Sequence, residues 1–254
     1  MPRFRLTLAY DGTAFVGWQR QPTGPSVQAL VEDALAVLDA RPVTVHSAGR
    51  TDAGVHALGQ VASASLDRDI TPRTLVRALN AHLPPDVRVL DATVVDAAFH
   101  AQFDAKSKLY RYQIWNGTAV PPMLRRYVWQ VAPPLDVAAM DAAAHRLLGR
   151  HDFAVFQSVG TDVPDTGREI LASGVSVWRP DADCAEAAGT LLRFEVEGTG
   201  FLRHMVRAIA GTLVEIGRGR RDPGWMSDLL ASRDRGAAGR TAPPEGLCLV
   251  RVTY

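Results

Sequence analysis

The clearest folding signal in this 254-residue chain is the alternation of side chains from Arg3 to Tyr10. Apolar or aromatic residues occupy every second position of the run, and mostly polar residues lie between them. Neighbouring side chains of an extended chain point to opposite faces, so this pattern predicts a strand with one buried face. The chain therefore contains at least one sheet.

Two amphipathic helices and further strands follow in the first half. Ser26 is a good N-terminal cap for a helix whose apolar residues, to Leu38, share one face. Thr71 and Pro72 predict a second helix start, with the helix continuing to about Asn80. Strand-type runs lie at 43–46, 60–66 and 87–90. This order predicts a mixed α and β layer.

The second half also mixes strands and helices. We expect strands at 106–115, 168–177, 191–196 and 247–252, and helices at 136–148, 201–217 and 222–231. A turn at 151–153 is expected after the first of these helices. The chain as a whole is predicted to be α+β, with two α/β halves at 1–104 and 105–254, mixed or antiparallel sheets, and helices packed on one side.

Composition gives a broad class without deciding the partner. The moderate share of charged residues fits a soluble globular protein, and no apolar run is long enough to span a membrane. The N-terminal segment lacks the apolar core and cleavage site of a signal peptide, so we expect a cytoplasmic protein. A net charge of +1 neither indicates nor excludes nucleic acid. Basic clusters at 106–111, 125–127 and 218–221 suit phosphate contacts, although each alone is more often a solvated face.

Cysteine and histidine spacing predicts no metal site. Cys184 and Cys248 lie far apart and match neither a paired metal motif nor a redox CxxC motif, so two reduced thiols are expected. The seven histidines show no HExxH or Cys-plus-His spacing. We expect no structural or catalytic metal.

Chemistry is concentrated in the loop from Ser47 to Ala57, between two strand-type runs. Gly49 and Gly54 permit the backbone angles of a tight loop. Between these glycines lie a guanidinium, a hydroxyl and a carboxylate, those of Arg50, Thr51 and Asp52. Such side chains either accept local backbone hydrogen bonds, as in many turns, or carry out chemistry on a ligand.

The string Arg-Thr-Asp-Ala-Gly-Val-His at 50–56 resembles, position by position, the active-site loop of the tRNA pseudouridine synthase A family. Similar stretches are Tyr-Asp-Gly with Phe-x-Gly-Trp-Gln at 10–19, the strand at 106–115, Phe-Leu-x-x-Met-Val-Arg at 201–207, and the segment 241–247. The resemblance therefore extends over nearly the whole chain.

This resemblance implies the pseudouridine synthase fold with a central RNA-binding cleft. It implies an isomerase that needs no cofactor and converts uridine to pseudouridine at positions 38, 39 and 40 of the tRNA anticodon stem-loop. The family acts as a homodimer with RNA bound across both subunits. Asp52 matches its catalytic aspartate, Tyr110 the tyrosine that packs against the target base, and Arg207 the basic residue that pairs with the aspartate.

Several roles stay open on the residues alone. Arg50 is placed to contact a phosphate or to hold the flipped backbone. Arg203 and Arg207 are four residues apart on the expected helix, so either is a candidate partner of Asp52. The carboxylate would attack the sugar, attack the ring, or abstract a proton. His56 is interpreted as a structural turn residue.

The aromatic residues have two readings. Phe15 and Trp18 fit core positions better than ligand contacts. Tyr110 and Tyr112 alternate on one strand face, which suits either a base-stacking platform or burial against another layer.

Two alternative functions remain beside the isomerase. A non-catalytic RNA-binding protein has no use for a carboxylate aimed at an anionic polymer. A base-releasing hydrolase ordinarily needs two carboxylates.

The string Asp165-Thr166-Gly167 looks superficially like an aspartic-protease signature, but it lacks a second carboxylate in a matching motif.

Overall fold

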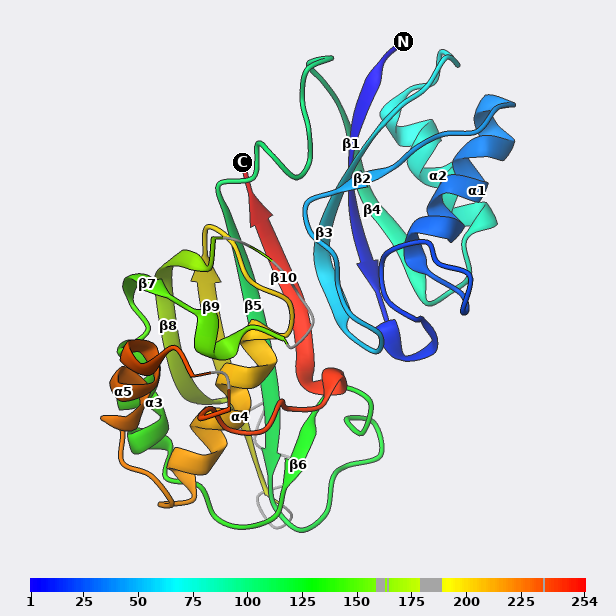
Figure 1. Cartoon of the computed structure of the whole chain (residues 1–254). Helices are drawn as coiled ribbons and strands as arrows, with labels where there is room; N and C mark the ends of the chain where they lie inside the picture. The colour runs from blue at the N-terminus through cyan, green and yellow to red at the C-terminus, as the bar shows by residue number, and fades with distance from the viewer. Residues whose placement is uncertain (159–162, 164, 179–188, 235) are drawn as a thin grey trace. The chain divides into compact units, whose positions relative to one another are not determined.

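The computed structural model describes residues 1–158, 163, 165–178, 189–234 and 236–254 (Figure 1). Cys184 lies outside the described residues, so the prediction of a reduced thiol there is not addressed. The chain forms two compact units, Met1–Lys106 together with Cys248–Tyr254, and Ser107–Leu247. The closing strand, expected in the second half, is therefore grouped with the first unit.

The first unit is built on a sheet with β1 (Arg3–Tyr10) at its centre. Strand β1 pairs antiparallel with β3 (His56–Ser65) and β4 (Val87–Val95), which confirms the strand predicted from alternation. On the other side of β3 lie the short β2 (His46–Ser47), antiparallel, and β10 (Leu247–Thr253), parallel. The buried face of β1 consists of Phe4, Leu6, Leu8 and Tyr10.

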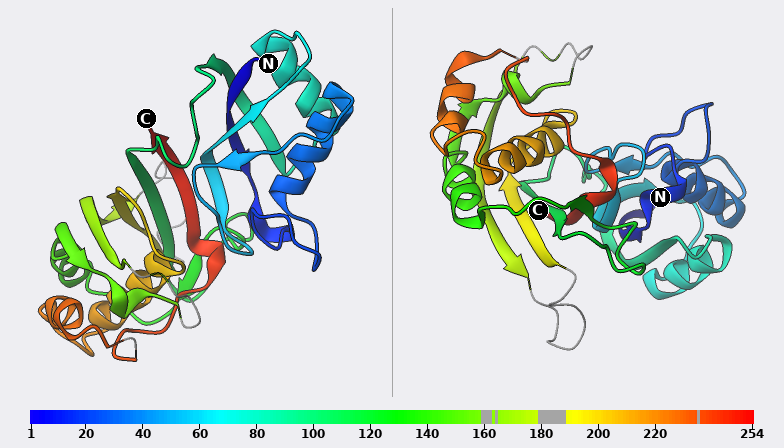
Figure 2. Two further views of the ribbon diagram at one scale, coloured as in Figure 1. Left: turned by 45° about the horizontal axis from the view of Figure 1, so that its top comes forward. Right: turned by 90° about the horizontal axis from the view of Figure 1, so that it is seen from below.

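Helices α1 (Val27–Asp39) and α2 (Pro72–His82) cover one face of this sheet (Figures 1 and 2). Both begin where the caps predict. Ser26 accepts a hydrogen bond from the Ala29 N–H at 3.4 Å, and Thr71 accepts one from the Thr74 N–H at 3.3 Å. The cap signals therefore define both helix starts.

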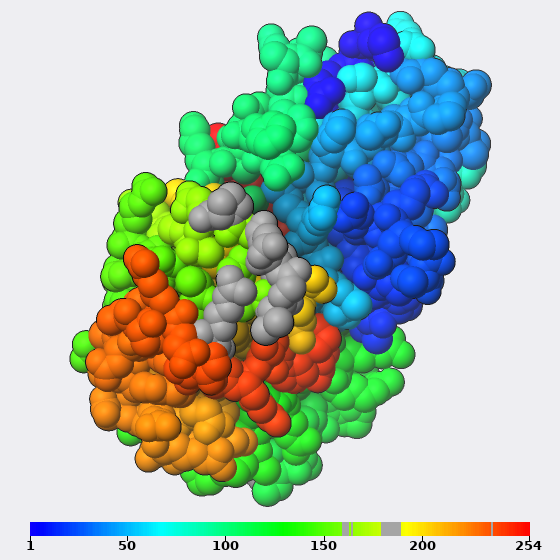
Figure 3. Space-filling view, viewed as in Figure 1, coloured from blue at the N-terminus to red at the C-terminus, as the bar shows by residue number. Residues whose placement is uncertain are grey.

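The second unit has a sheet in the order β5 (Ser107–Asn116), β9 (Thr190–Gly198), β8 (Gly167–Trp178), β7 (Gly149–Asp152), with antiparallel neighbours. Strand β6 (Trp129–Val131) pairs parallel with β5. The helices of this unit are α3 (Val137–His145), α4 (Met205–Gly217) and α5 (Trp225–Ser232). Helix α4 is almost wholly buried, whereas the stretch around α5, orange in Figure 3, lies at the surface.

Three single-turn helices complete the described elements. They are η1 (Gly12–Ala14), η2 (Ala154–Phe156) and η3 (Pro244–Gly246). The first and third lie within stretches that the sequence pattern treated as loops.

Some element boundaries differ from the predictions. Strand β3 begins at His56, so the end of the predicted loop is already paired with β1. Helix α3 ends at His145, three residues before the predicted end at Leu148. The predicted turn after it is instead partly strand, because Gly149–Asp152 pairs with β8. Short strands with exposed side chains carry no hydrophobic alternation, so this one left no signal.

The start of α4 corrects the argument about the two arginines. The helix was predicted from Phe201 but begins at Met205, and His204 before it has a left-handed backbone with φ of 62°. Arg203 is exposed and precedes the helix, and its carbonyl accepts a hydrogen bond from the Ser158 N–H. The two arginines therefore do not share a helix face, and Arg207 alone lies on α4.

Candidate active site

The Arg-Thr-Asp loop connects β2 to β3 in the first unit. Its base is closed by a hydrogen bond of 2.8 Å from the Ala48 N–H to the Val61 carbonyl. Its far side is a tight turn in which the Asp52 carbonyl accepts from the Val55 N–H at 3.1 Å. Thr51 is buried at 6% exposure, Asp52 is partly exposed and Arg50 is exposed. The loop thus anchors itself through its hydroxyl residue and presents its charged ones.

The loop at 11–19 braces the Arg-Thr-Asp loop through backbone contacts. The Trp18 N–H donates to the Thr51 carbonyl at 3.0 Å, and the Gly54 N–H donates to the Phe15 carbonyl at 3.3 Å. Between these bonds Gly17 forms an isolated antiparallel bridge with Asp52. The side chains of Phe15 and Trp18 are buried, which confirms their interpretation as core residues. The second motif therefore positions the first.

Glycines are required where these loops meet. Gly17 has φ of 112°, and a Cβ atom there would lie 2.7 Å from the Thr51 carbonyl oxygen. A Cβ atom on Gly12 would lie 2.0 Å from the Val55 carbonyl oxygen. Side chains at either position would push the bracing loop away from the backbone that carries Asp52.

His56 is part of this support. It is 5% exposed, and its Nδ1 accepts a hydrogen bond of 3.0 Å from the Gly12 N–H. The ring thus ties the start of β3 to the bracing loop, as expected for a structural residue.

The predicted tyrosines lie on β5 of the second unit. Tyr110 is 7% exposed and meets Phe201 edge-on, with ring centroids 5.1 Å apart. Tyr112 is fully buried, and its hydroxyl donates to the Pro243 carbonyl at 2.7 Å. For Tyr112 the structure favours the core interpretation over a stacking platform.

Arg207 is held by the C-terminal loop of the second unit. Its Nε donates to the Ala242 carbonyl at 2.8 Å, and the Ala242 N–H donates to the Arg207 carbonyl at 3.1 Å. This reciprocal pair ties the stretch at 241–247 to the helix that carries Arg207. The pairing of Arg207 with Asp52 stays a prediction.

Comparison with known proteins decides the family. A family model described as tRNA pseudouridine synthase matches residues 7–104 and 143–254. The chain belongs to the tRNA pseudouridine synthase family. This match, together with the observed helices and sheets, confirms the predicted α+β fold class.

Three relatives in this family are named tRNA pseudouridine synthase A. The protein of Myxococcus xanthus is 48% identical over 254 residues, covering 100% of this chain and 92% of that protein. The protein of Geotalea uraniireducens is 43% identical, with 100% of both chains covered. That of Moorella thermoacetica is 46% identical over 256 residues, again with 100% of both covered.

The three basic clusters of this pseudouridine synthase family member differ in how many of their charges are paired with carboxylates. Arg111 pairs with Glu195 at 2.8 Å. Glu215 pairs with both Arg218 and Arg220. Exposed arginines also lie at 125 and 126, before the exposed Tyr127. The first and third clusters are thus partly neutralised.

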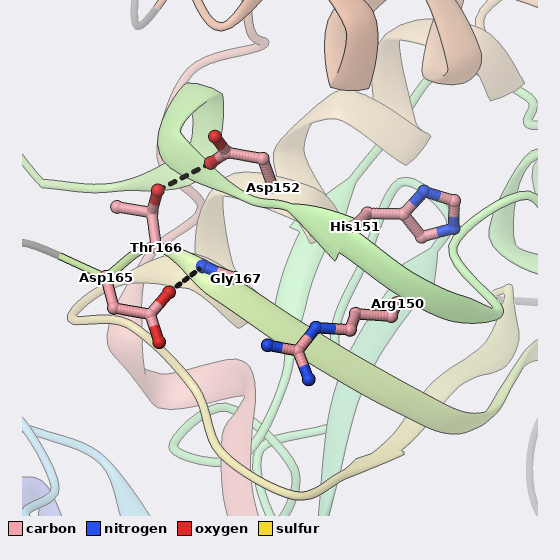
Figure 4. A pocket seen from close by; sticks show the side chains of 6 residues that line it. All are labelled: Arg150, His151, Asp152, Asp165, Thr166 and Gly167. Atoms are coloured by element: carbon pink, nitrogen blue, oxygen red, sulfur yellow. Dashed lines mark hydrogen bonds between the residues drawn. The ribbon is translucent and has the colours of Figure 1, made fainter.

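A shallow hollow of about 370 Å³ surrounds the Asp-Thr-Gly string (Figure 4). The Thr166 hydroxyl donates to Asp152 at 2.5 Å, and Asp165 accepts from the Gly167 N–H at 2.8 Å. Asp152 also pairs with Arg233 at 3.0 Å. The Thr166 hydrogen bond is the main cause that lowers the pKa of Asp152. Asp152 also accepts from the Ala154 N–H at 3.0 Å, so both carboxylates hold nearby backbone and hydroxyl groups in place, which is a structural role.

Replacement of Asp152 by Asn tests this structural role. A lowered pKa in the folded state contributes stability above the unfolded value of about 3.9, and this contribution is lost as the pH falls through the folded value. We expect Asp152→Asn to lower the free energy of unfolding at pH 7 by less than about 1 kcal/mol, because the ion pair is near the surface. Denaturant titrations should show the two proteins converging below pH 4, and a difference that grows at low pH would contradict the assignment.

The described residues of this family member contain no candidate metal-binding cluster and no candidate membrane-spanning helix. Among the described residues no group of three or more His, Cys, Asp or Glu side chains could hold a metal ion. Within the same parts of the chain, no helix is long and apolar enough to cross a lipid bilayer.

The sequence did not predict that the loop at 11–19 braces the Arg-Thr-Asp loop, or that Ala242 holds Arg207. Hydrogen bonds to the backbone between distant loops leave no residue pattern.

Proposed function

We propose that this protein isomerises uridine to pseudouridine at positions 38, 39 and 40 of the tRNA anticodon stem-loop, with Asp52 as the essential carboxylate. The observation that carries the proposal is the position of Asp52. Its peptide is held on both sides by backbone bonds from the bracing loop, while its side chain is partly exposed. A rigid backbone that presents one carboxylate suits catalysis on a bound ligand.

The reaction exchanges one glycosidic bond for another. The bond between uracil N1 and ribose C1′ breaks, the base turns, and a bond forms between C5 and C1′. The proton leaves C5, and N1 ends protonated, so composition and oxidation state are unchanged. No external nucleophile is consumed, which fits a site with a single essential carboxylate rather than the two of most glycosidases.

Each predicted site residue has a role in this scheme. In the proposed pairing, Arg207 would keep the Asp52 carboxylate ionised through its charge and hydrogen bonds. Tyr110 would pack against the extruded base and replace the stacking lost from the helix. Arg50 is exposed, and it makes no hydrogen bond or ion pair with any residue the structure describes, so it is suited to contact a phosphate.

The direct test uses an unmodified tRNA transcript, purified protein and no added cofactor. Carbodiimide treatment followed by reverse transcription should produce new stops at uridines 38 to 40. A transcript with cytidine at those positions is the matched control and should give none. Stops elsewhere, with none in the anticodon arm, would overturn the proposed position.

Two other functions are distinguished by the same reactions. A non-catalytic RNA-binding protein would retain the transcript without creating stops. A base-releasing hydrolase would liberate free uracil, measurable by chromatography, and would leave abasic sites. Pseudouridine without free uracil supports the isomerase.

We also propose that the protein acts in the cytoplasm as a homodimer, with tRNA contacting both subunits. Size-exclusion chromatography with light scattering should give about twice the chain mass of 27.5 kDa. Because phosphate contacts weaken with salt, tRNA binding should fall steeply between low and high salt. A mass equal to one chain at assay concentration, with full activity, would exclude the dimer.

A further inference from the structure

A buried polar network lies beneath the Arg-Thr-Asp loop. The hydroxyl of Tyr10 lies 2.8 Å from Thr51 Oγ1. The side-chain nitrogen of Gln60 lies 3.3 Å from the Tyr10 hydroxyl and 2.8 Å from the Gly49 carbonyl. Exposure of the three side chains is 5% for Tyr10, 6% for Thr51 and 0% for Gln60. The network therefore joins two strands to both sides of the loop, away from solvent.

The Gly49 carbonyl fixes the direction of both hydrogen bonds made by Gln60. The Gly49 oxygen can only accept, so Gln60 must present its NH₂ group there rather than its oxygen. The second hydrogen of the same group then points to the Tyr10 oxygen. Tyr10 therefore accepts from Gln60, and either hydroxyl can donate in the bond between Tyr10 and Thr51. The chain of hydrogen bonds runs from Gln60 through Tyr10 to Thr51, the residue before Asp52.

The side chain of Gln60 destabilises the fold through one unpaired atom. Its Oε1 atom is buried and has no hydrogen-bond partner among the described residues. An unpaired buried acceptor is destabilising, and an apolar side chain of similar size would avoid it. Burial also raises the pKa of Tyr10, so its hydroxyl stays protonated. The unpaired acceptor of Gln60 is explained if this position is needed for its two donors.

We propose that Gln60 and Tyr10 are positioning residues that hold the backbone of the Arg-Thr-Asp loop in its reactive conformation. Gln60 holds Gly49 before the charged residues, and Tyr10 holds the Thr51 side chain, next to Asp52. The Thr51 carbonyl is held separately by Trp18. The catalytic part of the inference rests on the proposed function, whereas the hold on the loop does not.

Tyr10→Phe removes one hydroxyl while keeping the ring in the core. We expect kcat for pseudouridine formation to fall about tenfold with KM unchanged within about twofold, because binding is retained and alignment is lost. Hydrogen exchange of the loop amides at 49–54 should accelerate at least tenfold. Tyr254→Phe is the matched control, because that hydroxyl donates to the Ala101 carbonyl at 2.6 Å in the same unit. It should change neither readout.

Gln60→Glu adds a readout that loss of folded protein would not produce. The ionised carboxylate cannot donate to Gly49, whereas the protonated acid can, and burial raises the pKa of such a carboxyl. The ratio of mutant to wild-type kcat should therefore rise as the pH is lowered. Gln60→Leu, which lacks donors at every pH, should give a flat ratio.

The outcomes separate this inference from the proposed function. Loop exchange in Tyr10→Phe and Gln60→Leu equal to that in Tyr254→Phe would overturn the positioning role, whether or not the wild type is active. Accelerated exchange with a wild type that forms no pseudouridine would support the hold on the loop and reject the proposed function. Accelerated exchange with unchanged kcat would reject the catalytic part.

Discussion

Asp52→Asn is expected to abolish pseudouridine formation, lowering kcat by at least about a thousandfold, while tRNA binding is retained or tightened. Asn has nearly the same shape and keeps an acceptor, so the braced loop should stay folded. The charged group needed for chemistry is lost, which is worth about 4 kcal/mol of barrier for a thousandfold. Removal of a negative charge near RNA phosphates favours binding.

Single-turnover assays on the anticodon stem-loop transcript, with binding measured by filter retention, check this prediction. Asp69→Asn is the matched control, because Asp69 is exposed and lies in the same unit outside both loops. It removes the same charge without changing either loop, and should retain activity. An active Asp52→Asn protein would reject the assignment of the essential carboxylate.

Gly211→Ala should have the largest effect on stability. Alanine in place of glycine inside a helix normally stabilises by about 1 kcal/mol. Here the added Cβ would lie 1.8 Å from the Arg240 carbonyl oxygen, where the C-terminal loop crosses α4. Backbone must move to relieve this overlap, so we expect a loss of about 3 kcal/mol. The displaced loop includes Ala242, so Arg207 loses its hold and kcat should fall as well.

Gly217→Ala is the matched control in the same helix. Its Cβ would meet the Met140 sulfur at 2.6 Å and Cγ at 2.8 Å, which belong to a flexible side chain rather than to backbone. We expect a smaller loss than for Gly211→Ala, about 1 kcal/mol by chemical denaturation, and nearly normal activity. Equal stability of the two variants would show that the loop at 239–242 yields without cost.

Helix starts were predicted correctly where residues next to them in the sequence determine them. Ser26 and Thr71 cap their own helices, so the starts of α1 and α2 could be predicted from a few neighbouring residues. The start of α4 could not, because the left-handed backbone at His204 interrupts a run that reads as a continuous helix. Arg203 was placed on the wrong element for that reason.

Within the candidate site, Asp52 and Arg207 were proposed from strings that resemble a known family, and their roles stay predictions. The contacts that hold these residues in place were not predicted. The hydrogen bonds that hold them join residues far apart, such as Gln60 with Gly49 and Arg207 with Ala242. No sequence pattern predicts which residue a glutamine inside a strand will contact, so the polar network is visible only in the structure.

The position of β10 has a consequence for how the protein is made. This strand holds the last residues of the chain, yet it pairs with β3, the strand that follows the Asp52 loop. Lys106 and Tyr254 add bonds between the two ends of the first unit. During translation the part of β3 that pairs with β10 stays open until the chain has been made as far as β10. A chain that stops before Leu247 therefore cannot complete the unit that carries Asp52, even though it contains the whole Arg-Thr-Asp loop.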